Sequence, residues 1–148
     1  VAGLPVGLYR HDRQGNRAVP VTGDASPAIP AALLDSAPSG TALVEIFVTA
    51  AFAPLAARYG ERGYRYALIE AGRLAAGIAR AAASLSLSAL GTGEFRDRDV
   101  DRLLRLDAVD RSTLYMVFIG AGAGQPPAEP ASRGEARLGR RRRRRGRR

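Results

Sequence analysis

Residues 64–87 read YRYALIEAGRLAAGIARAAASLSL. Positions that are polar or glycine recur there at intervals of three and four, and apolar residues, many of them alanine, fill the rest. The polar set consists of Glu70, Arg73, Gly77, Arg80 and Ser84. This spacing predicts one long helix that is apolar around most of its circumference. Such a helix must be covered on several sides, by its own domain or by a partner subunit.

Three further elements are expected before this helix. Short apolar runs at 6–11 and 18–21 flank a polar turn and predict a β-hairpin. Ser26, followed by Pro27, predicts the start of a helix that runs to about Asp35. The β-branched run at 42–49 predicts a largely buried strand.

The segments on either side of the long helix have clear boundaries. Residues 52–59 predict a short helix ending at Gly60, where a glycine tolerates a left-handed conformation. The segment 90–95, which reads LGTGEF, breaks the helical periodicity and predicts a loop between two helices. The apolar run at 113–119 predicts a strand that ends at Gly120.

The second of these two helices is predicted from its first residues. Asp97 or Asp99 is the expected cap, because an aspartate side chain accepts hydrogen bonds from the first free backbone N–H groups. Val100, Leu103 and Leu104 then share one face of an amphipathic helix.

Composition excludes several kinds of chemistry. The 148 residues favour a single domain, and cysteine is absent, which excludes a disulfide framework, a thiolate nucleophile and a Cys-ligated metal. His11 is the one histidine, so we expect no metal site and no hydrolytic triad. Charge-free stretches such as 112–128 are too short or too rich in Gly and Pro to cross a bilayer. We expect a soluble, cytoplasmic protein without a membrane partner.

The net charge of +9 is concentrated at the C-terminus. All 23 basic residues are arginine, and ten of them follow Gly120 with only two acids, whereas residues 1–120 hold 13 arginines against 12 acids. Residues 121–148 lack periodic hydrophobicity, which predicts a disordered basic tail after a folded body at 1–120. The tail contains no aromatic residue for base stacking, so nucleic-acid binding is expected only through counterion release there. An Arg-tailed nucleic-acid-binding protein is one alternative function.

Several blocks of residues together resemble the nitroreductase superfamily, and within it the SagB-type dehydrogenases, which include azoline oxidases. The most specific block is RYGERGYRYALIEAG, at 58–72. The other matching blocks, in order, are GLY at 7–9, LSL at 85–87, GEF at 93–95, LLRLD at 103–107 and the strand at 114–120.

The resemblance implies an α+β nitroreductase-like fold, with a central, mainly antiparallel sheet and a long buried helix. It also implies an FMN cofactor at the interface of an intertwined homodimer, and hydride transfer between flavin N5 and a small-molecule or azoline-containing peptide substrate. Residues 3–120 correspond to the C-terminal portion of the family domain. The Arg-Ser-x-Arg-like motif that holds the FMN phosphate in the family does not occur in this sequence. The alternative is therefore a non-catalytic fragment or remnant that cannot hold flavin.

The resemblance also assigns candidate cofactor-binding residues. Backbone N–H groups of Gly93 and Glu94 would donate toward flavin N5, with Gly91 and Thr92 adjacent. Glycine permits the close backbone approach that a flat ligand needs. The alternative is an ordinary turn between helices.

The catalytic Lys-Tyr pair of the azoline oxidases corresponds to Arg58 and Tyr59 here. A guanidinium stays protonated, so Arg58 cannot act as the base that a neutral lysine could be, although it could stabilise a tyrosinate or an anionic substrate. The alternative is that both residues serve as charge and cap at a helix C-terminus. Glu70 is spaced for an ion pair with Arg73, which we prefer to a ligand-binding role for that arginine.

Overall fold

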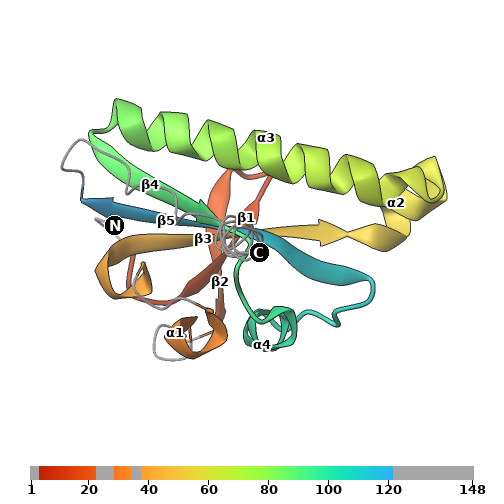
Figure 1. Cartoon of the computed structure of the whole chain (residues 1–148), viewed down its shortest axis with the longest axis horizontal. Coiled ribbons are helices and arrows are strands. Elements are labelled where there is room, and N and C mark those ends of the chain that lie inside the picture. The colour runs from red at the N-terminus through yellow and green to blue at the C-terminus, as the bar shows by residue number, and fades with distance from the viewer. Residues whose placement is uncertain (1–3, 23–28, 35–37, 122–148) are drawn as a thin grey trace, which may run out of the picture.

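A computed structural model describes residues 4–22, 29–34 and 38–121. Figure 1 shows the arrangement of its strands and helices. In chain order the elements are β1 (Leu8–Asp12), β2 (Arg17–Thr22), α1 (Ile29–Ala32), the 3₁₀ turn η2 (Ser39–Thr41), β3 (Ala42–Ala51), α2 (Phe52–Tyr59), α3 (Arg62–Ser84), β4 (Leu87–Thr92), α4 (Asp97–Leu103) and β5 (Arg111–Ala121).

The central sheet has three strands in the order β3-β5-β4, and both pairings are antiparallel. The long helix α3 crosses one face of this sheet, and α1 and α4 lie on the other (Figure 1). The predicted hairpin forms as β1 and β2, which pair with each other in a separate two-stranded sheet. The α+β fold with a mainly antiparallel sheet is thereby confirmed.

The core is divided into two clusters by strand β5. Successive side chains of a strand point to opposite faces of the sheet, and both faces of β5 are covered. Met116 and Phe118 pack with Val100 of α4 on one face, and Val117 and Ile119 pack with Ala82 of α3 on the other. The continuous apolar run of this strand is explained by burial on both sides.

Most of the predicted elements form close to their expected bounds. The buried strand, the short helix and the last strand correspond to β3, α2 and β5. Gly60 follows α2 with φ of 60°, the kind of conformation for which glycine was expected there. Of the helix expected at 26–35, α1 covers Ile29–Ala32, whereas Ser26, Pro27 and Asp35 lie outside the described residues. The tail at 122–148 lies outside them as well.

The prediction of a loop at 90–95 is wrong for the first half of that segment. Leu87–Thr92 forms strand β4, which pairs with β5 from Ala121 to Met116. Helix α3 accordingly ends at Ser84 and does not reach Leu87, and Ser86 turns the chain with φ of 57°. Alternate residues of β4 face the two core clusters, and pairing with β5 outweighs the weak local preference of a Ser- and Gly-containing segment.

The capping expected for α4 is also wrong. The helix starts at Asp97, but its N-cap residue is Arg96, and no side chain caps it. Asp99 instead forms an ion pair with Arg102, at 3.1 Å. The start of α4 is set by a tertiary contact, because the Arg96 backbone N–H donates to the Ala32 carbonyl oxygen at 2.8 Å.

Helix α3 is buried along one face only. Small residues line that face, at Gly63, Ala67, Ala71 and Ala82. Three large apolar side chains remain substantially exposed, Leu68 at 44%, Ile69 at 52% and Leu74 at 53%. The described chain therefore leaves uncovered much of the apolar surface that the periodicity predicted to be covered. Within the described residues, no helix is both long and apolar enough to cross a membrane.

Candidate functional site

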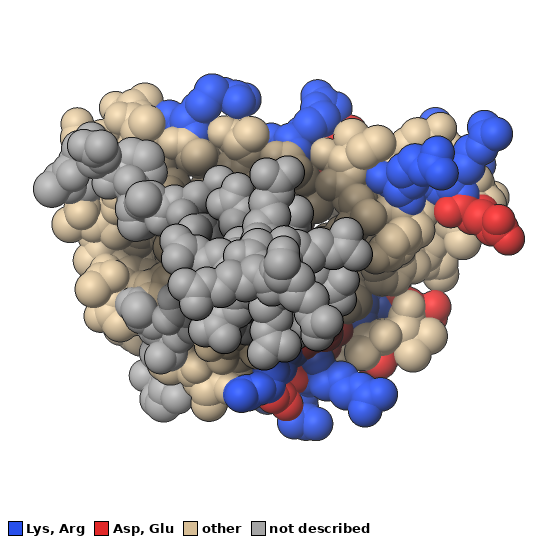
Figure 2. All heavy atoms as spheres, in the orientation of Figure 1, with Lys and Arg blue, Asp and Glu red and all other residues tan. Residues whose placement is uncertain are grey.

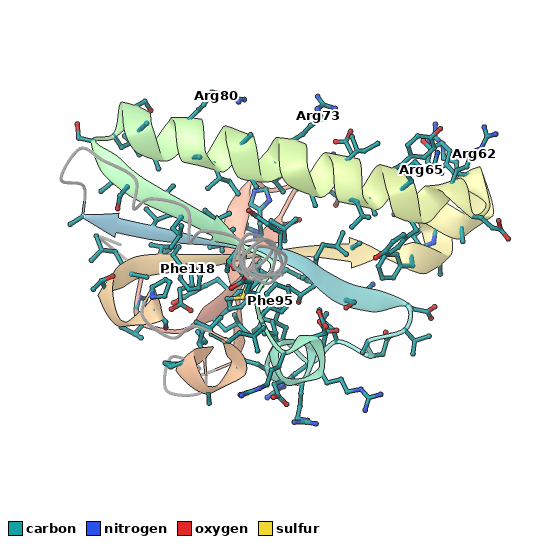
Figure 3. All side chains as sticks on the ribbon, viewed as in Figure 1. Arg62, Arg65, Arg73, Arg80, Phe95 and Phe118 are labelled. Atoms are coloured by element: carbon teal, nitrogen blue, oxygen red, sulfur yellow. The ribbon has the colours of Figure 1, made fainter. Side chains whose placement is uncertain are left out.

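The Gly91–Glu94 segment leaves the sheet where β4 ends. Gly91 and Thr92 are the last residues of the strand, and Gly93 and Glu94 form the turn that follows. The hydroxyl of Thr92 accepts a hydrogen bond from the Glu94 backbone N–H at 2.9 Å. Phe95, which is buried in the core, anchors the end of the turn (Figure 3). The turn is thus held at both ends.

Gly93 is the open point of this turn. It is exposed, and a Cβ built on it would meet no atom within 4 Å. In the described part of the chain its backbone N–H has no acceptor, whereas that of Glu94 is taken by Thr92. Gly93 can therefore receive a flat ligand and offer it a hydrogen bond without a change in the backbone.

Gly91 lies under an aromatic ring. A Cβ at this position would lie 2.6 Å from Cε1 and 2.7 Å from the hydroxyl oxygen of Tyr115. Tyr115 is on the neighbouring strand β5, where Gly91 pairs with Val117, so the two residues are diagonal neighbours. The room that Gly91 leaves is thus occupied by Tyr115, a residue that sequence reasoning did not single out.

Arg58 and Tyr59 lie at the C-terminal end of α2. The guanidinium carbon of Arg58 lies 5.2 Å from the centre of the Tyr59 ring, a cation–π arrangement. The same ring makes an edge-to-face contact with Tyr66 of α3, with ring centres 5.0 Å apart. Tyr59 is 40% exposed, so solvent reaches part of this residue although its ring contacts both neighbours.

The structure does not bring these two candidate groups together within one chain. Helix α2 follows the end of β3 at which Ala51 pairs with Arg111, whereas β4 ends where Thr92 pairs with Met116. Five residue steps along β5 separate the two places, about 17 Å at the rise of an extended strand. Figure 1 shows α2 at one end of the molecule and the end of β4 near its middle.

The arginines of α3 are not directed at the Gly91–Glu94 segment. Figure 3 shows Arg62, Arg65, Arg73 and Arg80 pointing away from the sheet, and in Figure 2 basic side chains follow that edge of the molecule. Arg73 forms the predicted ion pair with Glu70, at 2.8 Å.

Arg96 lies next to the segment but is also engaged, since its guanidinium donates to the carbonyl oxygen of Ala31. The open turn at Gly93 leaves the space that a flat ring such as flavin needs, whereas none of these five arginines is directed at this turn to hold a phosphate.

His11 and Glu45 are two further titratable groups that the structure describes. His11 is exposed and forms a hydrogen bond with the Asn16 side chain at 3.1 Å. No group of three His, Asp or Glu residues in the described ranges is arranged to hold a metal ion. Glu45 is half-buried, and desolvation raises the pKa of its carboxyl, opposed by a hydrogen bond from Ser39 at 2.6 Å.

The fold and the site together define a class of protein: an α+β domain with a glycine turn beside a mainly antiparallel sheet. The sequence matches the model of the Nitroreductase family over residues 10–121, and the chain therefore belongs to the nitroreductase family. This is a family of oxidoreductases whose members generally use FMN. A comparison with curated proteins gives no match.

Solved structures that share the fold include the following two. One is an Anabaena variabilis protein assigned as a nitroreductase, with a TM-score of 0.78 and 22% identity over 86% of this chain. The other is a chain of the E. coli microcin synthetase McbBCD complex with truncated pro-MccB17 bound, with a TM-score of 0.70 and 20% identity over 78% of this chain. The matched region spans 27% of the first of those chains and 44% of the second.

Proposed function

We propose that this chain forms part of an FMN-dependent oxidoreductase of the SagB type, in which hydride passes between a substrate and flavin N5. The observation that carries the proposal is the open turn at Gly93, within a segment matched by the family model. Bound FMN supplies the hydride acceptor or donor.

In this function the chain's own residues shape the flavin-facing surface. The Gly93 backbone N–H is free to donate to the ring, and the Thr92 hydroxyl holds the Glu94 N–H so that the turn keeps its form. A preorganised donor aimed at a position where charge develops stabilises the transition state without reorganisation.

Tyr59 is the proposed proton-handling group. Its ring contacts Arg58 and Tyr66, and the residue is 40% exposed. Arg58 stays protonated and its guanidinium contacts the Tyr59 ring, so Arg58 would hold Tyr59 in place or bind an anionic substrate group and not act as the base. The substrate class we favour is an azoline-containing peptide, because the RYGERGYRY block resembles azoline oxidases and one structural neighbour belongs to a complex with a bound propeptide.

A homodimer is part of the same proposal. Leu68, Ile69 and Leu74 expose apolar surface on α3 that a second copy would cover. A second copy would also supply a second Tyr59, which the single chain holds far from its own Gly93. The two protomers together would then complete each site.

The experiment is the visible absorption spectrum of the 148-residue chain with and without FMN, together with its mass in solution. We expect the flavin spectrum to shift on binding and the mass to be that of a dimer. Tyr59→Phe should lower turnover of an azoline peptide more than 100-fold, within the usual range for loss of a general acid or base. The same variant should bind FMN with unchanged affinity. If the chain does not bind FMN, it is the non-catalytic fragment or remnant. RNA binding lost on deletion of residues 122–148 would assign the tail a separate role.

A further inference from the structure

Tyr115 makes a contact with Gly91 that the sequence motifs do not predict. It lies on β5, the central strand, and its ring crosses to the neighbouring strand and covers Gly91. The room for the ring exists only because residue 91 has no side chain. The pair therefore places a phenol beside the last residues of β4, next to the turn at Gly93.

The hydroxyl of Tyr115 is available for a ligand. Within the described ranges it has no hydrogen-bond partner. The fully buried side-chain polar atoms without a partner in that part of the chain are Glu45 Oε2 and Thr113 Oγ1, so the Tyr115 hydroxyl is not one of them. The half-buried ring packs against the cluster of Ala82, Val117 and Ile119, so its position is fixed while its hydroxyl has no partner in the described residues.

Strand β4 does not extend along β5 as far as Tyr115. Strand β4 pairs with β5 only from Met116 onward, so along 111–115 β3 is the only strand in the described residues that pairs with β5, and Asp101 of α4 accepts the Thr113 backbone N–H there. Beyond Thr92 the chain turns away toward Phe95 and the opposite face of the sheet. Tyr115 thus stands at the corner where β4 leaves the sheet.

We propose that the Tyr115 hydroxyl donates a hydrogen bond to the polar edge of the flavin ring, and that Gly91 serves to position Tyr115. This assignment rests on the proposed function. It gives the ring a second donor from β5 beside the backbone N–H of Gly93. It also assigns Gly91 a different task from Gly93, because Gly91 makes room for a side chain and Gly93 leaves room for the ligand.

The test uses the whole chain with FMN and riboflavin as probes, followed by flavin fluorescence. Tyr115→Phe keeps the ring and removes only the hydroxyl, so the fold is retained. We expect roughly three- to tenfold weaker binding of both probes, the loss of one neutral hydrogen bond. The midpoint potential of bound FMN should become more negative, because a donor that stabilises the reduced, electron-rich ring is lost. Tyr64→Phe, the same change on an exposed tyrosine of α3, is the matched control.

A second variant separates positioning from direct contact. Gly91→Ala places a Cβ against the Tyr115 ring and forces the ring to move, so it should weaken binding as much as Tyr115→Phe. The double variant should lose no more than Gly91→Ala alone, because the two changes remove the same hydrogen bond.

Unchanged affinity and potential in Tyr115→Phe, in a chain that does bind flavin, would overturn this assignment and leave the proposed function standing. Additive losses in the double variant would overturn the positioning role of Gly91. A wild-type chain that binds neither probe would overturn the proposed function and this assignment with it.

Discussion

The carboxylate of Asp101 accepts a hydrogen bond from the Thr113 backbone N–H, with 2.8 Å between Oδ1 and the amide nitrogen. Its second oxygen accepts one from the Ser112 hydroxyl at 2.6 Å. Asp101 is 1% exposed, so this link between α4 and β5 lies in the interior. Burial of a carboxylate is unfavourable unless its oxygens accept hydrogen bonds, and here both of them do.

Asp101→Ala should therefore lower the free energy of unfolding by about 2–4 kcal/mol, since it leaves a buried N–H and a hydroxyl unpaired and removes packing. Urea unfolding followed by circular dichroism measures the change. The control is Asp97→Ala, an exposed position on the same helix, for which a loss of at most about 1 kcal/mol is expected. Equal losses at the two positions would contradict the role of the buried carboxylate.

Glu45 should make the protein less stable as pH rises. Burial raises the pKa of its carboxyl above the ordinary value of 4.5, against a hydrogen bond from Ser39 that lowers it. The folded state then binds the proton more tightly than the unfolded state, so the stabilisation is complete below pH 4.5 and is lost as pH passes the raised pKa. Glu45→Gln should remove this decline in urea titrations between pH 4 and 7. Ser39→Ala should make it steeper, and a flat wild-type profile with an unchanged Glu45→Gln profile would refute the prediction.

Asp107 should have the opposite effect. Backbone N–H groups of Arg111 and Val109 donate to its carboxylate, and these hydrogen bonds hold its pKa below the ordinary value of 3.8. Its contribution is present above pH 3.8 and is lost as pH falls through the lowered pKa. Asp107→Ala should therefore destabilise the protein at pH 7 more than at pH 2. The comparison requires only thermal melts at the two pH values, and a larger loss at pH 2 would rule the prediction out.

Gly93→Val should separate binding from folding. The residue has open space around it, and its φ is not positive, so a valine is accommodated without strain. The change in unfolding free energy should stay within about 1 kcal/mol, whereas FMN affinity should fall more than tenfold because the side chain occupies the space of the ring. Isothermal titration with FMN, beside a urea titration of the same sample, tests both parts. Undiminished FMN affinity would exclude Gly93 from the flavin site.

The exposed apolar face of α3 should hold the proposed dimer together. Ile69→Arg places a charge among side chains that a second copy would bury, so the mass in solution should fall from dimer to monomer. Val109→Arg is the control, because Val109 is 78% exposed and lies in the loop between α4 and β5, outside α3. Sedimentation measures both variants, and an Ile69→Arg dimer as stable as wild type would place the interface elsewhere.

Local patterns predicted those elements whose evidence lies within one stretch of chain. Helix α3 follows from a spacing of three and four over about four turns, from Glu70 to Ser84. The apolar run at 113–119 is long enough to indicate β5 without knowledge of its partners. The i,i+3 pair of Glu70 and Arg73 follows from the same helical geometry.

Strand β4 could not be predicted in this way, because its residues LSALGT show no strong preference and take their conformation from ladder bonds to β5. Arg96 likewise begins α4 because its N–H meets Ala32, a residue of a distant segment. Such contacts have no signature in the neighbouring sequence.

Some features of the candidate site could likewise be predicted from the sequence, and others could not. The glycines of LGTGEF and the Arg58-Tyr59 pair could be singled out from the sequence, because each is a local run of residue types. Tyr115 over Gly91, the separation of Tyr59 from Gly93, and the single covered face of α3 exist only once β4 pairs with β5. Periodicity and turn residues determine the local backbone conformation, which depends on consecutive residues. Strand register and side-chain contact between strands arise from hydrogen bonds and packing between residues far apart in the chain, and those depend on the whole fold.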